Sequence, residues 1–212
     1  MNTFAGMSNT IDDKMREFGL VDITELNPAI KTDIRYATPD NFVGEIIYSE
    51  PFGVYAEPRL ANAIANAQET LSSMFPGYSI VIFDAARPLS AQKKMFKIVE
   101  NTEKEQYVAN PNGQFEGGFH NYGMAVDLSI ANEKGELLDM GTDFDSFFPE
   151  SHVGNERNLV AEGKISMQAY VNRMLLYMIM GEQGLLPYPF EWWHYQLDQN
   201  EEAKSNFTVL DF

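Results

Sequence analysis

The sequence predicts an α+β fold in which helices flank an antiparallel sheet. Residues 58–75 and 166–183 are expected to be long helices, the first because its apolar residues recur at helical spacing and the second because Gly184 stands where a left-handed cap is needed. Residues 78–83 and 125–130 are rich in β-branched and aromatic side chains, which is typical of core strands. These helices and strands follow no regular strand–helix–strand alternation, so an antiparallel sheet is favoured over a parallel one.

The first elements of the chain are predicted to be short. Residues 12–18 should form a helix that Thr10 or Asn9 caps and that Gly19 stops. Two extended segments are expected to follow: residues 21–26 and residues 32–36.

The middle of the chain combines one more helix with a long polar stretch. Ser90, two residues after Pro88, is predicted to cap a helix that runs to about Val99. Residues 101–118 are rich in Asn and Gly, which indicates a loop, and a loop of this length in a compact domain is more often a functional lid than a spacer. The remaining elements are a turn at residues 133–136, an extended piece that ends near Met140, and a last strand at residues 192–197.

The composition is that of a folded and strongly acidic protein. Of the 212 residues, 44% are hydrophobic, and the net charge is −16. A chain of this size most often forms one domain, so we expect residues 1–20 to be an N-terminal helical extension and residues 21–212 to be a single domain. The negative field repels phosphates and anionic lipid, which makes nucleic acid and acidic membrane surfaces poor partners.

The absence of cysteine restricts the chemistry that the chain can use. Disulfides and thiolate metal ligands are excluded, so any metal ion must be held by histidine and carboxylate. The strongest apolar run, residues 174–180, is too short to span a bilayer, and residues 1–12 lack the basic segment and apolar run of a signal peptide. The chain is therefore expected to be soluble, in the cytoplasm or, if a signal has been removed, in the periplasm. Its oligomeric state is left open.

Two of the three histidines lie near carboxylates, in the pairs His120 with Asp127 and Glu191 with His194. Two imidazoles and one carboxylate as ligands, with a second carboxylate free as a base, are the inventory of a catalytic zinc site. Gly123 and the alternating residues after it predict a turn that enters a strand, which can aim His120 at the same point as Asp127. Taken alone, this pair is equally compatible with a hydrogen-bonded loop histidine.

The second pair needs an irregular strand. Positions three apart face opposite sides of an ideal strand, so a bulge or turn is required to bring Glu191 and His194 to one metal ion. Trp192 and Trp193 between them are more often core residues than site residues. Arg87 follows the best predicted core strand, at a position where loops carry catalytic groups, although by itself it would be interpreted as a surface ion-pairing residue.

Considered together, these motifs resemble a known group of enzymes. The resemblance rests on five ordered segments between about Val21 and Tyr195: residues 35–42, 84–88, 120–127, 140–145 and 191–194. They are similar to the zinc D-alanyl-D-alanine dipeptidases of the vancomycin-resistance type, within the wider group of D-Ala-D-Ala, lysostaphin and hedgehog-like metallopeptidases. The resemblance implies that the antiparallel sheet carries a zinc site.

The resemblance also implies a role for each residue of the site. His120, Asp127 and His194 would ligate one Zn²⁺ and leave a position open for water. Glu191 would take a proton from that water and later give it to the leaving amine. Arg87 would stabilise the oxyanion that develops on the scissile carbonyl.

Two further residues would select the substrate. The resemblance implies that Asp145 and Tyr36 bind the free amino terminus, so that the site accepts a small D-amino-acid dipeptide and rejects longer chains. The expected activity is therefore zinc-dependent hydrolysis of D-Ala-D-Ala, a dipeptide of cell-wall peptidoglycan chemistry.

One departure from the family pattern leaves alternatives open. The dipeptidases usually have Ser two residues before the first zinc histidine, and this chain has Gly118 there. The substrate could thus be a peptidoglycan stem peptide, cut by a D,D-carboxypeptidase or an endopeptidase, and a non-catalytic zinc-binding module of the same fold is a further alternative. His152, the third histidine, is interpreted as structural.

Overall fold

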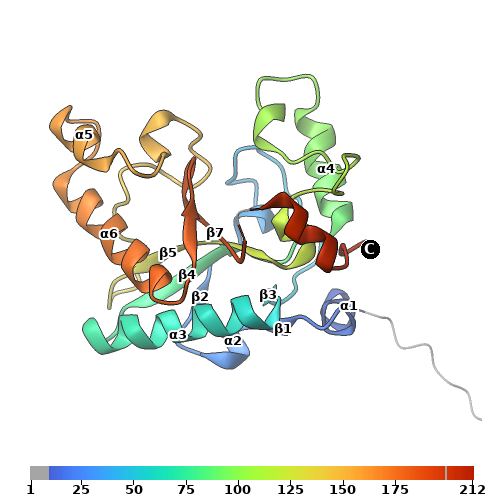
Figure 1. The fold of residues 1–212 in the computed structure, drawn as a ribbon, viewed down its shortest axis with the longest axis horizontal. Coiled ribbons are helices and arrows are strands. Elements are labelled where there is room, and N and C mark those ends of the chain that lie inside the picture. The colour runs from blue at the N-terminus through green and yellow to red at the C-terminus, as the bar shows by residue number, and fades with distance from the viewer. Residues whose placement is uncertain (1–9, 199) are drawn as a thin grey trace, which may run out of the picture.

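A five-stranded sheet forms the centre of the protein, which a computed structural model describes over residues 10–198 and 200–212 (Figure 1). The strands lie in the order β2-β4-β5-β7-β6, with these bounds: β2 Lys31–Thr32, β4 Ser79–Asp84, β5 Ala125–Ala131, β7 Glu191–Gln196 and β6 Leu186–Tyr188. Strand β2 runs parallel to β4, and every other neighbouring pair is antiparallel. The predicted α+β class is confirmed, and the predicted antiparallel pairing is wrong only for the edge strand β2.

The helices are distributed around this sheet. Their bounds are α1 Ile11–Glu17, α2 Ile23–Leu26, α3 Pro58–Met74, α4 Leu89–Val99, α5 Glu156–Ala161 and α6 Met167–Gly181. Short 3₁₀ turns occur at Arg35–Ala37, Glu105–Tyr107, Phe119–Tyr122, Pro149–Ser151 and Glu201–Asn206, and β1 Val21–Asp22 pairs with β3 Tyr55–Ala56 in a separate ribbon. Within the described residues, no helix is long and apolar enough to cross a membrane.

The main core lies between one face of the sheet and two helices. Alternate residues of β4 and β5, such as Ile82 and Leu128, belong to the same buried cluster as Ile64 of α3 and Ile179 of α6. Helix α3 crosses beneath the sheet in Figure 1. Because successive side chains of a strand point to opposite faces, the intervening residues of β5 and β7 face away from this core. That second face carries the candidate site.

Several predicted elements are confirmed with small shifts at their ends. Thr10 caps α1 through a reciprocal bond with Asp13, whereas Asn9 lies outside the described residues. Helices α3 and α6 occupy the predicted ranges, and Ser166 caps α6 by accepting a hydrogen bond from the amide of Ala169. Met15 of α1 is buried in a cluster shared with parts of the chain beyond residue 50. The division into an extension and a domain at residue 20 stays a prediction.

Three local predictions are wrong. Residues 21–26 are extended only at Val21–Asp22, because the Asp22 carboxylate accepts a hydrogen bond from the backbone amide of Thr24 and so caps the start of α2. The segment 32–36 leaves the sheet after Thr32 and turns into the 3₁₀ helix Arg35–Ala37. Ser90 lies inside α4, which begins one residue earlier with Pro88 at the cap position. Strand β6 and helix α5 were not predicted at all.

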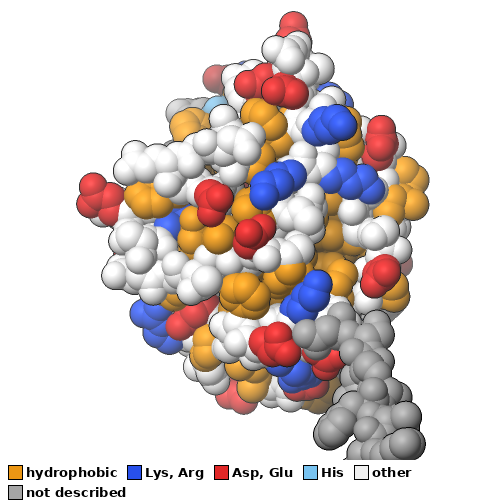
Figure 2. Space-filling view, turned by 90° about the vertical axis from the view of Figure 1, so that its right-hand side faces the viewer, with side chains coloured by type: hydrophobic (Ala, Val, Ile, Leu, Met, Phe, Trp, Pro, Cys, Tyr) orange, Lys and Arg blue, Asp and Glu red, His pale blue; other side chains and the backbone are white. Residues whose placement is uncertain are grey.

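One face of the molecule carries charged side chains of both signs. Figure 2 shows the face on the α4 side of the molecule, where basic and acidic side chains are interspersed among hydrophobic ones. The net charge of −16 therefore does not appear there as one continuous acidic area.

Candidate metal centre and active site

His120 reaches the sheet through the turn that the sequence predicts. It lies in the 3₁₀ helix Phe119–Tyr122, and Gly123 then adopts a φ of +67° before β5 begins. A side chain at Gly123 would be strained by this conformation, and its Cβ would lie 2.7 Å from Leu20 Cδ2. The turn brings His120 Nε2 within 3.4 Å of Asp127 Oδ2.

Glu191 and His194 are brought together by the irregularity that their spacing requires. In the pairing of β6 with β7, Tyr188 lies opposite Glu191 while Pro187 lies opposite Tyr195, so the register shifts between these partners. The Oε2 atom of Glu191 consequently lies 3.8 Å from Nδ1 of His194. The predicted irregularity, a bulge or turn, is thus confirmed as a shift of register.

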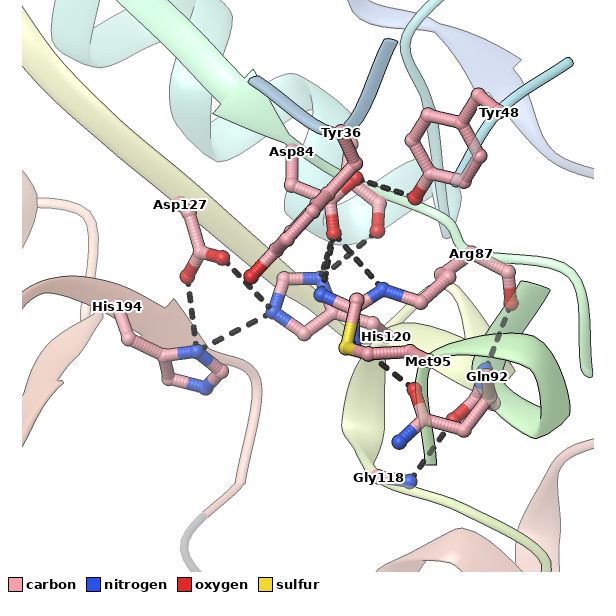
Figure 3. A network of polar contacts seen from close by, with 12 residues as sticks. Tyr36, Tyr48, Asp84, Arg87, Gln92, Met95, Gly118, His120, Asp127 and His194 are labelled. Atoms are coloured by element: carbon pink, nitrogen blue, oxygen red, sulfur yellow. Dashed lines mark hydrogen bonds and ion pairs between the residues drawn. The ribbon is translucent and has the colours of Figure 1, made fainter. Parts of the chain in front are cut away.

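Three side chains converge on the second face of the sheet, as Figure 3 shows for His120, Asp127 and His194. Their ligand atoms lie within 4.8 Å of one another. His194 Nδ1 is 3.0 Å from Asp127 Oδ1 and 3.2 Å from His120 Nε2. The direct cause is the pairing of Asp127 with His194 across β5 and β7, which places the two side chains on the same face.

The outer nitrogens of both imidazoles have acceptors as partners. His120 Nδ1 lies 2.8 Å from the carbonyl oxygen of Ala85, which can only accept, so this nitrogen bears the proton. His194 Nε2 lies 2.8 Å from Oε1 of Gln196, whose amide nitrogen in turn donates to the carbonyl of Asp198. By the same argument the proton of His194 is on Nε2.

These tautomers leave two nitrogen lone pairs facing each other across 3.2 Å, beside a carboxylate. Although burial raises the pKa of Asp127, the imidazoles of His120 and His194 hold it well below the usual range. Asp127 is therefore ionised. His120, Asp127 and His194 thus direct two imidazole nitrogens and one carboxylate at one point, and they form a group that could hold a metal ion.

Glu191 lies beside this group without belonging to it. Burial raises its pKa to about 7, with the charge of Asp127 adding to the effect and His194 opposing it. A carboxyl group with a pKa near neutrality can both take up and release a proton at neutral pH, as acid–base chemistry requires.

Arg87 is held rigidly at the same cavity. It is only 7% exposed, and its Nε and Nη2 atoms donate to Asp84 Oδ2 over 3.0 and 2.6 Å. Nη1 donates to Gln92 Oε1 over 2.8 Å, and the guanidinium stacks on the Tyr36 ring at 4.9 Å. The alternative of a surface ion pair is wrong. Nη1 also donates weakly to Met95 Sδ over 3.8 Å, so the second N–H of Nη2 is the one that remains available to an oxygen in the cavity.

Asp145 and Tyr36 form a contact between distant segments. The Tyr36 hydroxyl donates to Asp145 Oδ1 over 3.2 Å, and the amide of Phe42 donates to Oδ2 over 3.4 Å. Desolvation, with the nearby charge of Asp127, raises the pKa of Asp145 to about 8. Asp145 also has a φ of +59°, a left-handed conformation that is uncommon for a residue with a side chain.

All seven predicted residues line one cavity of about 670 Å³. It lies between residues 101–118, whose Tyr107 and Gly118 form part of the wall, and the segment after Met140, which contributes Phe147. These two segments rise on opposite sides of β7 in Figure 1. The loop predicted as a functional element is thus part of the site. His152 also lines the cavity, where its ring meets Phe190 at 5.1 Å.

The backbone at Gly118, where the resemblance implies a serine, is held by hydrogen bonds. The backbone amide of Gly118 donates to Oδ1 of Asn121 over 2.9 Å. The side-chain Nδ2 of Asn121 donates to the backbone carbonyl of Arg87 over 2.9 Å. Gly117 has a φ of +79°, and a Cβ there would lie 2.1 Å from Asn121 Oδ1. Asn121 is fully buried and so ties the approach to His120 to the segment that carries Arg87.

Sequence reasoning missed the residues that support the site. Asp84, Gln92, Asn121 and Gln196 were given no role, yet each makes a hydrogen bond to Arg87 or to a histidine of the metal group. Gln196 could have been noticed, since it is two residues from His194 in a predicted strand and therefore shares its face. Asn121 and Gln92 offered no comparable pattern.

Comparisons with known proteins identify the family of the chain. The profile of the D-Ala-D-Ala dipeptidase family matches residues 16–211. The chain is similar to a D-alanyl-D-alanine dipeptidase of Escherichia coli, with 32% identity over 85% of each chain. It is also similar to a D-alanyl-D-alanine dipeptidase of Enterococcus faecalis, with 30% identity over 91% of this chain and 99% of the relative. The cluster, the cavity and the match over nearly the whole chain together show that this protein belongs to the D-Ala-D-Ala dipeptidase family of metallopeptidases and is an enzyme.

Proposed function

We propose that the protein hydrolyses D-Ala-D-Ala with a zinc ion held by His120, Asp127 and His194. Two imidazoles and one carboxylate without a thiolate suit zinc and leave a coordination position for water. When bound, zinc would supply a Lewis acid that acidifies this water and polarises the scissile carbonyl. The observation that carries the proposal is the convergence of two imidazole nitrogens 3.2 Å apart beside Asp127, with the carboxylate of Glu191 3.8 Å from His194.

Glu191 is proposed as the residue that moves protons. As a carboxylate it accepts a proton from the attacking water, whose oxygen forms a bond to the carbonyl carbon. As a carboxylic acid it then gives this proton to the nitrogen of the leaving amino acid while the C–N bond breaks. A pKa raised to about 7 supports this alternation, because neither form is strongly disfavoured at neutral pH.

Arg87 is proposed to stabilise the negative charge that develops on the carbonyl oxygen. Its contacts with Asp84 and Gln92 fix the guanidinium before substrate arrives, so little reorganisation is required during the reaction. Burial strengthens its interaction with an oxyanion. The neutralising carboxylate of Asp84 lies behind the guanidinium and compensates its charge in the absence of substrate.

Asp145 and Tyr36 are proposed to hold the ammonium group of the substrate. An ionised Asp145 would pair with the ammonium, and the hydroxyl of Tyr36 orients the carboxylate through its hydrogen bond. A blocked or extended amino terminus would leave this carboxylate buried without its partner, which costs free energy. The arrangement therefore supports a substrate with a free amino terminus one residue before the scissile bond.

A second candidate is release of D-Ala from longer peptidoglycan stems. Gly118 favours this alternative, since it lacks the hydroxyl that the dipeptidases usually present two residues before the first ligand. The non-catalytic module is disfavoured by membership in an enzyme family and by the presence of both Glu191 and Arg87.

A substrate panel tests the proposal. Protein stripped with a chelator and reloaded with one equivalent of zinc is assayed for amine release from D-Ala-D-Ala, L-Ala-L-Ala, N-acetyl-D-Ala-D-Ala and a pentapeptide ending in D-Ala-D-Ala. We expect activity on free D-Ala-D-Ala only, and none before zinc is added. Faster release from the pentapeptide or the acetylated dipeptide would replace the dipeptidase assignment with the carboxypeptidase one, and full activity without metal would exclude the zinc site.

A further inference from the structure

The loop that carries Asp145, residues 140–150, is fastened at both ends by one buried side chain. Arg173 of α6 has no exposed surface, and its Nε atom donates to the carbonyl of Met140 over 2.7 Å. Its Nη2 atom donates to the carbonyl of Glu150 over 2.8 Å. The same guanidinium therefore holds the first and the last residue of the loop and fixes the distance between them.

Arg173 is an unusual residue to find at this position. Within residues 10–198 and 200–212, no carboxylate lies within ion-pair distance of it, and its Nη1 atom has no hydrogen-bond partner. Burial of an arginine without a carboxylate in contact costs far more free energy than burial of an apolar side chain of the same length. The bonds to the two loop carbonyls compensate part of this cost, and Tyr177 and the charges of Glu156 and Asp139 compensate another part.

The loop has a second attachment, to the strand of the active site. The indole nitrogen of Trp192, next to Glu191 in β7, donates to Thr142 Oγ1 over 2.8 Å. Thr142 also bonds to Ser151, whose hydroxyl donates to the carbonyl of Ser146. The Arg173 guanidinium lies over the Trp192 ring at 6.0 Å. The two residues that hold the loop, Arg173 and Trp192, are thus in contact with each other.

Asp145 needs such support because of its own backbone. A φ of +59° is unfavourable for a residue with a side chain and persists only where the surroundings enforce it. The direct contacts of its carboxylate, from Tyr36 and Phe42, are long at 3.2 and 3.4 Å. The flanking residues Phe144 and Phe147 pack against Trp193, and the fastened ends of the loop add to this support of Asp145.

We propose that Arg173 is a positioning residue for substrate binding, which holds residues 140–150 so that Asp145 meets the ammonium group of the dipeptide. This inference rests on the proposed function, in which Asp145 binds that group. Arg173 itself lies outside the cavity and touches neither substrate nor metal ligands. Its effect is therefore on recognition of the amino terminus and not on the chemical step.

The test compares variants of α6 in the zinc-loaded protein. Arg173→Met removes both hydrogen bonds at similar length, and Arg173→Lys keeps the charge with a single nitrogen. Ile179→Ala, in the core face of the same helix, is the control for a general loss of stability because it is buried in the main core cluster. Trp192→Phe removes the bond to Thr142 and provides a second loosening of the loop if Arg173→Met does not fold.

Three measurements decide the outcome. We expect Arg173→Met to raise KM for D-Ala-D-Ala by about tenfold or more with kcat within about threefold, and Arg173→Lys to recover part of this loss. Amides of residues 141–149 should exchange hydrogen faster in Arg173→Met, whereas Ile179→Ala should change neither KM nor this local exchange. In an Asp145→Ala background, Arg173→Met should have no further effect on KM, because Arg173 affects substrate binding only by positioning Asp145.

The opposite results overturn the inference. Unchanged exchange in residues 141–149, or effects of Arg173→Met and Asp145→Ala on KM that simply add, would exclude a role of Arg173 through Asp145. Failure of the proposed function is distinguishable from this, since it appears as absence of D-Ala-D-Ala cleavage by the unaltered protein. The exchange measurement does not depend on activity.

Discussion

Gln196 accepts a hydrogen bond from His194 through an oxygen that lies 2.8 Å from Nε2. The contact determines which nitrogen of the imidazole keeps the proton, and it leaves Nδ1 free to face Asp127 and His120. Partners of this kind usually orient a histidine ligand and increase its basicity.

Gln196→Ala should therefore weaken zinc binding by about 10- to 100-fold while the fold is retained. Competition with a chromophoric chelator measures the affinity. Gln196→Glu, which keeps an acceptor for Nε2, should restore most of it. Equal affinities for the unaltered protein and Gln196→Ala would remove Gln196 from the site.

Removal of the metal ligands should weaken zinc binding more than Gln196→Ala does. The double variant His120→Ala, Asp127→Ala should retain no stoichiometric zinc after dialysis, because a single imidazole holds the ion weakly. His152→Ala is the matched control, since this histidine lines the same cavity outside the metal group and should leave zinc content unchanged. Elemental analysis of both proteins gives the answer, and one zinc per chain in the double variant would show that the ion binds elsewhere.

Glu191→Gln should separate catalysis from metal binding. The amide keeps the size of the side chain and removes its ability to move a proton, so turnover should fall by roughly 10²- to 10⁴-fold with zinc still bound. Glu182→Gln, at the exposed end of α6, serves as the control and should have normal turnover. A Glu191→Gln enzyme with near-normal kcat would falsify the assignment of the base.

Arg87 should contribute to both rate and stability. Arg87→Lys should keep zinc and lose on the order of 10²-fold, mainly in kcat, because one ammonium replaces a fixed and forked donor. Arg87→Ala should in addition destabilise the protein by about 3–5 kcal/mol, since Asp84 is then buried without its partner. Steady-state kinetics and urea unfolding of the two variants separate these effects. A change confined to KM would contradict the role at the oxyanion.

The pH dependence of stability should reflect Asp145. Its pKa in the folded protein is raised to about 8, above the value of about 3.9 expected in an unfolded chain. The protonated form is thus favoured by folding, so the stability contribution is complete below pH ~4 and is lost as the pH rises through about 8. The Tm of the metal-free protein should fall between pH 5 and pH 8, and Asp145→Asn should reduce this fall. Asp143→Asn, an exposed neighbour in the same loop, should not; a steeper fall in Asp145→Asn would reverse the sign that we assign.

Much of the site could be predicted from sequence because its chemistry is confined to short motifs. The pairs His120 with Asp127 and Glu191 with His194 indicated a metal group and a base, and their spacing required the turn at Gly123 and the irregularity of β7 that the structure contains. Local rules were less successful where a side chain competed with the expected backbone. Asp22 starts a helix within a segment that resembled a strand, since its carboxylate satisfies a free amide.

The sequence by itself determined the residue types of the site, the long helices and the core strands, since these follow from periodicity and from residues close together in the chain. Only the tertiary structure decided which residues support the site. Gln92, Asn121 and Arg173 act through hydrogen bonds to Arg87, or to carbonyls 23 and 33 residues away in the case of Arg173. Such bonds form only once the fold has brought distant segments together, because the packing of the fold supplies the partner of a buried polar side chain. No periodic pattern in the sequence predicts them.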